Sequence, residues 1–166
     1  MTQLTEPEAR QMIAVVNTRN VEKVVEQYAE NASFQVPSLE SPIQGKAAIR
    51  SYLTSAFTAF PDWTMDVSKV IIEGNEAIVV NSVHGTHTGP YTDSDGKAVA
   101  PTNKSFVQEQ LTRVVVDEKG KVALFRAYGN PSRMNRLLRS PNAPKQSAGS
   151  ESTVSTPSVA PLAASK

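Results

Sequence analysis

Two histidines three residues apart, His84 and His87, are the first candidates for chemistry in a chain that contains no cysteine. An imidazole titrates near neutral pH, so a histidine can transfer a proton in catalysis. Both lie in a stretch typical of a β-strand. Side chains at this spacing on a strand point to opposite faces, so one ion cannot bind both rings. We therefore predict no metal site, and we expect His87 to hydrogen-bond loop backbone where the strand ends.

Two glutamines, Gln108 and Gln110, alternate along a later strand. Their amide N–H groups could hold a substrate carbonyl or an enolate. A four-residue turn after this strand sets its register against the next one, and places Gln110 opposite Ala127 and Gln108 opposite Gly129. Because residues two apart share a face, Phe125 lies on the same face as Ala127.

An earlier turn, Glu-Gly-Asn-Glu, sets the register of the strand that carries His84. It pairs Ile71 with Ile78 and Met65 with His84. Alternation along the strand then predicts that Ser82 and His84 share one face.

The elements that must position these residues change in periodicity at Pro61. Before it, apolar residues recur at helical spacing, and after it Val and Ile alternate as in strands. Thr5 and Asn20 are placed to cap the first two helices. We predict a helix after Thr5, helices at 21–28 and 46–60, strands at 33–36, 64–72, 77–87, 102–116 and 121–129, and a short last helix at 131–139. This order predicts an α+β fold whose helices cover one face of an antiparallel sheet.

The overall composition excludes several classes of protein. Across 166 residues, 17 basic and 16 acidic side chains nearly cancel, which argues against a dedicated nucleic-acid binder. The lack of cysteine excludes disulfide scaffolds, cysteine-ligated zinc and iron–sulfur clusters. No apolar run approaches the roughly 18 residues of a membrane span. The polar N-terminus lacks the pattern of a secretory signal, so we expect a cytoplasmic protein.

The composition changes near Ser140. Residues 140–166 hold four of the 11 prolines and no aromatic residue. Such a segment buries too little apolar area to offset the entropy of ordering it. We therefore expect one domain over residues 1–139 and a disordered tail over residues 140–166.

Four short motifs, taken in order, resemble a known family. They are SPIQGK at 41–46, FPDW at 60–63, GTHTG at 85–89 and RAYGNP at 126–131. Their order and spacing resemble the SnoaL-like polyketide cyclase or ester cyclase group, within the nuclear-transport-factor-2-like superfamily. The resemblance covers about residues 5 to 139.

This resemblance implies a cone-shaped barrel in which a curved antiparallel sheet wraps around the N-terminal helices and leaves a deep apolar pocket. It also implies a homodimer formed through the outer face of the sheet, where Glu109, Arg113 and Arg126 would lie, with Arg126 opposite Leu111 and in diagonal reach of Glu109. In cyclases of this group a pocket carboxylate closes a polyketide-like ester by proton transfer, without metal or organic cofactor.

One position departs from the family pattern. Relatives carry Asp or Glu between the Arg and the Tyr of the last strand, where this chain has Ala127. The resemblance turns the face of His84 toward the pocket, so His84 becomes the candidate catalytic residue. The expected substrate-binding residues are Ser82, Gln108, Gln110, Phe125, Ala127, Tyr28 and Trp63.

Three functions remain open at this point. The first is a cofactor-independent cyclase or isomerase acting on a small apolar carbonyl compound. The second is a protein that binds an apolar ligand without catalysis, which the missing acid at Ala127 favours. The third is a dimeric interaction module in which the pocket is filled by its own side chains, with Tyr28 and Trp63 as packing residues.

Overall fold

The computed structural model describes residues 2–92 and 97–130. The last helix predicted at 131–139 and the tail predicted over 140–166 lie outside the described residues. Within the described ranges, no helix is long and apolar enough to cross a membrane.

Three helices form, and the first two begin at their predicted caps. Helix α1 spans Glu6–Asn17. Thr5 and Glu8 form a capping box, in which the Glu8 N–H donates to Thr5 Oγ1 and the Thr5 N–H donates to Glu8 Oε2. Helix α2 spans Val21–Glu26 and is capped by Asn20, and helix α3 spans Lys46–Ala59. Helix α2 ends two residues before its predicted end because Tyr28 already belongs to a strand.

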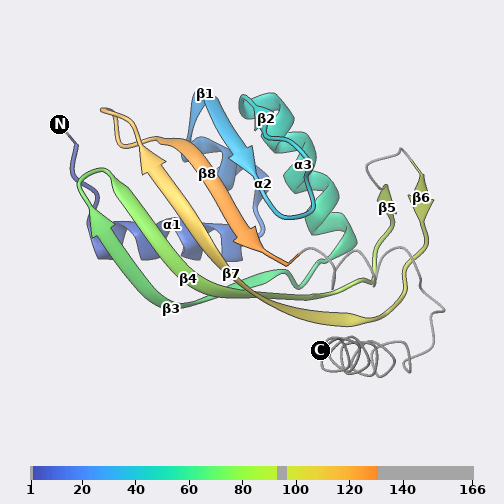
Figure 1. Ribbon diagram of the computed structural model, residues 1–166. Coiled ribbons are helices and arrows are strands. Elements are labelled where there is room, and N and C mark those ends of the chain that lie inside the picture. The colour runs from blue at the N-terminus through green and yellow to red at the C-terminus, as the bar shows by residue number, and fades with distance from the viewer. Residues whose placement is uncertain (1, 93–96, 131–166) are drawn as a thin grey trace, which may run out of the picture.

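Six strands form the main sheet, in the order β2-β1-β8-β7-β4-β3 (Figure 1). Neighbouring strands are antiparallel except for the pair β1 and β8, which is parallel. A separate pair of short strands, β5 and β6, lies between the predicted strands at 77–87 and 102–116. The strands are β1 (Tyr28–Gln35), β2 (Ile43–Gln44), β3 (Thr64–Glu73), β4 (Glu76–Thr86), β5 (Tyr91–Thr92), β6 (Ala98–Val99), β7 (Ser105–Val116) and β8 (Val122–Gly129).

The register between β3 and β4 follows the prediction only near the turn. Ile71 pairs with Ile78 as predicted. Beyond Val67 the register shifts by one residue, so His84 pairs with Thr64 and the predicted pairing with Met65 is wrong. A β-bulge of this kind is invisible to turn geometry alone.

The register between β7 and β8 is displaced by two residues from the prediction. Ala127 lies opposite Thr112 and Gly129 lies opposite Gln110. An irregularity between Val115 and Val116 accounts for part of this displacement. Because the displacement is an even number of residues, the predicted faces survive although the predicted partners are wrong.

The same displacement changes the pairing on the outer face. Arg126 lies opposite Arg113 and not opposite Leu111, whose partner is Tyr128. Arg113 forms its ion pair with Glu76, at 2.6 Å between Nε and Oε1. The predicted diagonal contact between Glu109 and Arg126 was therefore based on a wrong register.

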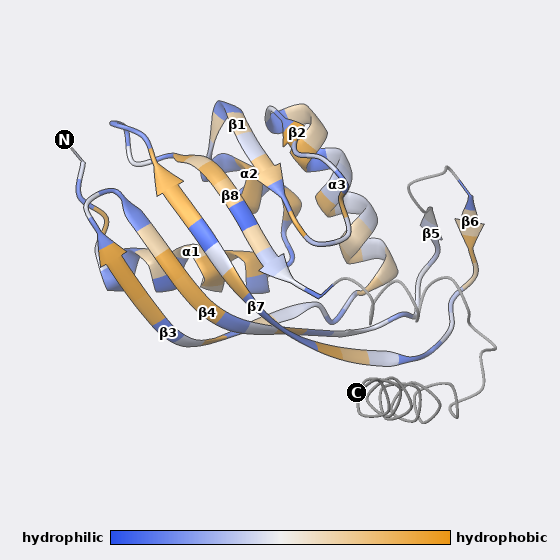
Figure 2. Ribbon diagram, in the orientation of Figure 1, coloured by the Kyte–Doolittle hydropathy of each residue, from blue (hydrophilic) through white to orange (hydrophobic). Residues whose placement is uncertain are grey.

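The helices pack against the concave face of the curved sheet, and this layer contains the core (Figure 1). Along β4, Ala77, Val79, Asn81 and Val83 are buried while the residues between them are partly exposed. Figure 2 shows hydrophobic stretches on β3, β4 and β7 that are interrupted by hydrophilic bands. The expected α+β architecture, with a curved sheet over N-terminal helices, is confirmed.

Candidate functional site

An apolar pocket lies between the concave face of the sheet and the helices. Its volume is about 50 Å³, which is room for a few waters. Helices α1, α2 and α3 contribute to it together with strands β1, β3, β4, β7 and β8. The lining residues are Val16, Val24, Tyr28, Phe34, Val36, Pro37, Ser38, Tyr52, Leu53, Ala56, Phe57, Trp63, Met65, Val83, Gln108, Gln110 and Phe125.

Aromatic rings form one wall of this pocket. Phe34 of β1 and Phe125 of β8 are register partners in the parallel pair, and their rings stack with centroids 5.2 Å apart and planes 10° apart. Tyr52 of α3 packs against Phe34 at 5.2 Å, and the ring of Tyr28 lies 6.4 Å from that of Phe125. The pairing of β1 with β8 therefore builds this wall.

The two tyrosines of the pocket stay neutral at physiological pH. Burial raises the pKa of Tyr52 to about 12, although its hydroxyl lies 3.2 Å from Ser38 Oγ. Burial also raises the pKa of Tyr28 above its ordinary value. Both hydroxyls can therefore form hydrogen bonds, and neither acts as a base near pH 7.

Polar side chains of β4 and β7 meet on the concave face. Thr112 is fully buried, and its Oγ1 accepts hydrogen bonds from Asn81 Nδ2 at 2.9 Å and from Gln110 Nε2 at 3.3 Å. Two buried acceptors, Asn81 Oδ1 and Gln108 Oε1, have no hydrogen-bond partner among the described residues. Such atoms are uncommon in proteins and need a donor from water or from a ligand.

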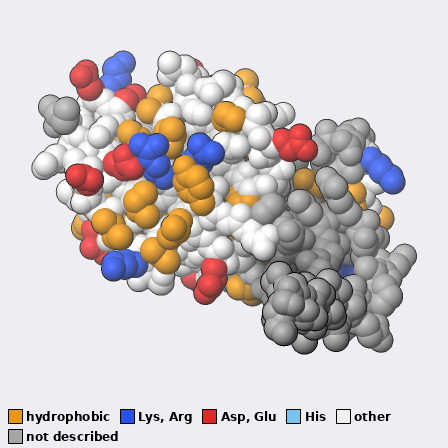
Figure 3. Space-filling view, viewed as in Figure 1, with side chains coloured by type: hydrophobic (Ala, Val, Ile, Leu, Met, Phe, Trp, Pro, Cys, Tyr) orange, Lys and Arg blue, Asp and Glu red, His pale blue; other side chains and the backbone are white. Residues whose placement is uncertain are grey.

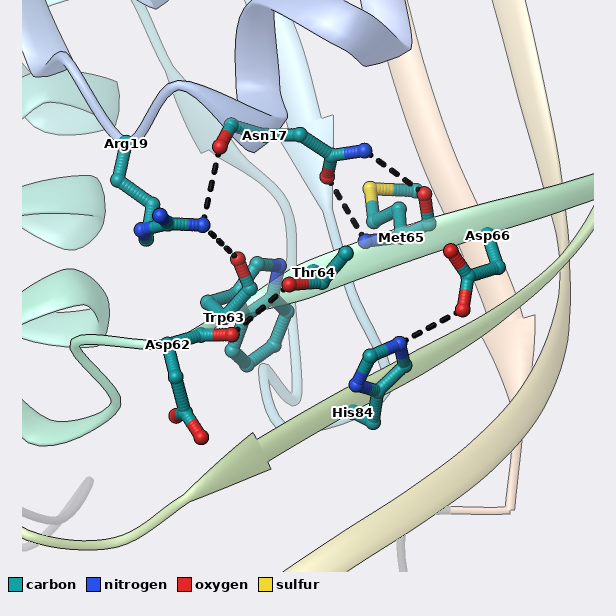
Figure 4. Close-up of polar contacts among 8 residues, drawn as sticks. All are labelled: Asn17, Arg19, Asp62, Trp63, Thr64, Met65, Asp66 and His84. Carbon is teal, nitrogen blue, oxygen red and sulfur yellow. Dashed lines mark hydrogen bonds and ion pairs between the residues drawn. The ribbon is translucent and has the colours of Figure 1, made fainter.

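His84 lies on the opposite face of the sheet from this pocket. Its side chain is 39% exposed, and its Nε2 lies 2.7 Å from Asp66 Oδ2 (Figure 4). The predicted orientation of His84 toward the pocket is wrong, because β4 pairs Val83 with Gln108 and turns Val83 inward. Both alternating sets of β4 contain apolar residues, so hydropathy did not distinguish the two faces.

Five of the seven predicted substrate-binding residues line the pocket, and two do not. Ser82 shares the outward face with His84, so its predicted pocket position is also wrong. Ala127 is buried on the concave face opposite Thr112, yet it does not line the cavity. The five residues that line it are Tyr28, Trp63, Gln108, Gln110 and Phe125.

Asn81 is the polar residue that sequence reasoning missed. It is 2% exposed and lies directly opposite Gln110. Pairing β4 with β7, and not only with β3, would have placed it beside the glutamines. A lone asparagine between Val79 and Val83 in a buried alternating set was the available signal.

His87 has the structural role expected for it. It is fully buried, and its Nδ1 accepts a hydrogen bond from the backbone N–H of Thr102 at 3.3 Å. Its ring lies 5.4 Å from that of Phe60. Burial lowers the pKa of His87, so the ring is neutral near pH 7. Among the described residues, no group of three or more His, Cys, Asp or Glu side chains is placed to hold a metal ion.

The comparisons with known proteins agree with this architecture. A family model described as a SnoaL-like domain matches residues 9–125. No curated protein matches the chain. AclR from Streptomyces galilaeus is similar in structure, with a TM-score of 0.67, 17% identity and 89% of each chain covered. A protein assigned to the SnoaL-like polyketide cyclases, from Jannaschia sp. CCS1, has a TM-score of 0.65 and 16% identity, with 87% of this chain and 100% of that chain covered.

A third similar structure is that of an enzyme with a described role, SalBIII. SalBIII is described as an epoxide hydrolase/cyclase-like enzyme with a role in pyran ring formation in the polyether salinomycin. It has a TM-score of 0.58 and 21% identity, with 73% of this chain and 86% of that chain covered. At these identities the structural likeness concerns the fold.

Proposed function

This chain belongs to the family of SnoaL-like domains, and from that premise we propose that it binds one small, neutral, mostly apolar organic molecule in the pocket between sheet and helices. The observation that carries the proposal is the chemistry of the pocket wall. Among the described residues that line it, none carries a charge, and most are aromatic or aliphatic. A charged ligand would lose its hydration there without gaining a counter-charge.

The same observation weakens the expected proton-transfer reaction. A cyclase or isomerase of this kind needs a base whose pKa lies near the working pH. His84 is on the outer face, and the family acid position holds Ala127. Of the described lining residues, the tyrosines have raised pKa values and cannot accept a proton near pH 7. Binding without catalysis is therefore the function that we propose.

Benzofuran, a neutral bicyclic ring, is a suitable probe for this proposal. The chain has one tryptophan, Trp63, which lines the pocket, so its indole N–H gives one resonance in a nitrogen–proton correlation spectrum. We expect benzofuran to shift this resonance in a saturable way. Retained small molecules in protein purified from its own host, observed by native mass spectrometry, would give the natural ligand class.

Two alanine variants on α3 provide the control. Ala56 lines the pocket and is 7% exposed, whereas Ala47 is exposed on the same helix. Ala56→Leu should fill the cavity and weaken benzofuran binding about tenfold or more, and Ala47→Leu should leave it unchanged. Equal binding to both variants, or no saturable binding to the wild type, would remove the proposal.

We also propose that a second copy of the chain covers the convex face. Four large apolar side chains are about half exposed there: Ile71, Val107, Leu111 and Tyr128. Figure 3 shows apolar side chains gathered on this face, with acidic and basic side chains between them. An exposed apolar patch of this kind favours association. A groove of about 500 Å³ crosses β3, β4, β7 and β8 at this surface.

The convex face carries both basic and acidic side chains, and such a face can pair with a second copy of itself about a two-fold axis. Arg126 lies over the ring of Tyr128, at 4.9 Å from its centroid, and Glu109 and Asp66 line the groove. In an isologous contact each copy offers both signs of charge to the other. This arrangement supports a homodimer.

A further inference from the structure

We propose that the pocket selects a flat aromatic molecule that carries one neutral N–H or O–H donor, and that Gln108 Oε1 accepts its hydrogen bond. This inference rests on the proposed binding function and adds the polar group of the ligand to it. Of the buried atoms without a hydrogen-bond partner among the described residues, one belongs to a residue that lines this pocket, and it is an acceptor, Gln108 Oε1.

Gln108 is the residue that carries the inference. It is 7% exposed, it lines the pocket, and its Oε1 is buried without a hydrogen-bond partner among the described residues. A buried acceptor in this state has lost its water and has gained nothing in return. A donor that enters the pocket with the ligand would restore the missing hydrogen bond.

The neighbouring glutamine, Gln110, differs from Gln108 because its side-chain amide has a hydrogen-bond partner within the protein. Gln110 lies on the same strand and face, and its Nε2 donates to Thr112 Oγ1 at 3.3 Å. Its amide is therefore already engaged within the protein, whereas that of Gln108 is left for another partner. The two residues form a matched pair for experiment.

Packing holds the Gln108 amide in place. A Cβ atom at Gly129 would come within 2.8 Å of Gln108 Nε2, so the amide lies directly against the backbone of that glycine. The absence of a side chain at Gly129 therefore makes room for Gln108.

The walls of the pocket define the rest of the ligand. Phe125 and Phe34 present nearly parallel rings, and Trp63 and Tyr52 add further aromatic surface. The cavity of about 50 Å³ is small, so the lining side chains must move less for a flat ring than for a bulky skeleton. Because no described lining residue is charged, the donor must itself be neutral, which excludes an ammonium group.

Indole and benzofuran provide the test, because they have the same bicyclic shape and differ in the N–H that benzofuran replaces with an ether oxygen. Isothermal titration calorimetry on the whole chain should give indole a dissociation constant about tenfold lower than that of benzofuran. Phenol against anisole repeats the comparison with an O–H donor.

Two variants then locate the acceptor. Gln108→Met keeps the length of the side chain without the amide, so indole should lose its advantage while benzofuran binds within about twofold of the wild type. Benzofuran binding also reports that this variant folds. Gln110→Met is the matched control and should retain the preference for indole.

The outcomes separate this inference from the proposed function. Equal affinity for indole and benzofuran in the wild type would overturn the inference and leave apolar binding intact. A preference for indole that persists in Gln108→Met would overturn the role of Gln108. Failure of both probes to bind would overturn the proposed function together with this inference.

Discussion

The side-chain amide of Asn17 pairs with both backbone polar groups of Met65. Asn17 Oδ1 accepts from the Met65 N–H at 2.8 Å, and Asn17 Nδ2 donates to the Met65 carbonyl at 2.9 Å (Figure 4). Strand β3 is an edge of the main sheet, so these groups have no strand beside them. The last residue of α1 therefore supplies the pairing that a further strand would give, and it protects part of the edge.

Asn17→Ala should destabilise the domain by about 1–3 kcal/mol, because two backbone groups of the buried Met65 lose their partners. Urea denaturation followed by circular dichroism measures this change. Asn17→Asp keeps the acceptor for the Met65 N–H but sets a carboxylate oxygen against the Met65 carbonyl, so it should also be destabilising. Equal stability of Asn17→Ala and the wild type would show that water replaces the amide at this edge.

His87 makes stability depend on pH. Burial lowers its pKa in the folded state, so the unfolded chain binds the proton more readily. Stability should therefore be complete above the unfolded pKa of about 6.5 and should fall as the pH drops below it. His87→Gln should flatten this dependence of the melting temperature on pH. An unchanged or steeper dependence in this variant would contradict the assignment.

Gly129→Ala should cost no more than about 1 kcal/mol, because the new methyl group would meet the end of the flexible Gln108 side chain, which can turn aside. Most of this cost should disappear when Gln108→Ala is already present, since the shortened side chain leaves the space empty. A double-mutant cycle by chemical denaturation measures the coupling. Additive effects would mean that the contacts with Gln110 Cβ and the Glu109 carbonyl, both at 3.3 Å, cause the loss.

Ala127→Asp would restore a carboxyl group at the family position. Because Ala127 is 5% exposed, desolvation should raise the pKa of the new carboxyl above the ordinary value of about 3.9. The folded state then binds the proton more tightly, so the variant should lose stability as the pH rises through 4 and above. Val107→Asp, at a 53% exposed site, is the control. Carbon-13 titration distinguishes the two, and an ordinary pKa at position 127 would place that side chain in water.

Leu111→Glu should weaken the proposed homodimer. Leu111 is 47% exposed and lies in the groove of the convex face, where a buried carboxylate would lack a partner. Sedimentation equilibrium should show the wild type as a dimer at micromolar concentration and this variant as a monomer. Ala47→Glu, on the exposed side of α3, should remain dimeric. A wild-type monomer would remove the proposal.

The sequence was sufficient for elements whose determinants are local. Thr5 and Asn20 cap the helices that they were predicted to cap, and the turn near Gly74 pairs Ile71 with Ile78. Capping and tight turns depend on a few neighbouring residues, so their signals are complete within a short window.

The predicted strand pairings are wrong where a strand contains an irregularity, because one extra residue shifts the register of every pair beyond it. The register shift beyond Val67 moved His84 from Met65 to Thr64, and the displacement in β8 moved Ala127 from Gln110 to Thr112. In β4 the two faces look alike in hydropathy, so the orientation of His84 was decided by analogy and was wrong. The hydrogen bond between Asn81 and Thr112 depends on how β4 pairs with β7, and turn geometry does not predict that pairing.

The parallel pairing of β1 with β8 has a consequence for how this protein folds. Phe34 and Phe125 lie roughly ninety residues apart in the chain, yet they stack in the wall of the pocket. Contacts of such high sequence separation must close a long loop before they gain any stability, so they form slowly. On the ribosome, β1 emerges early, and the edge that pairs with β8 stays open until residues 122–129 have been synthesised. Ligand-binding capacity should therefore be the last property that a nascent chain acquires, and its appearance would time the completion of the sheet.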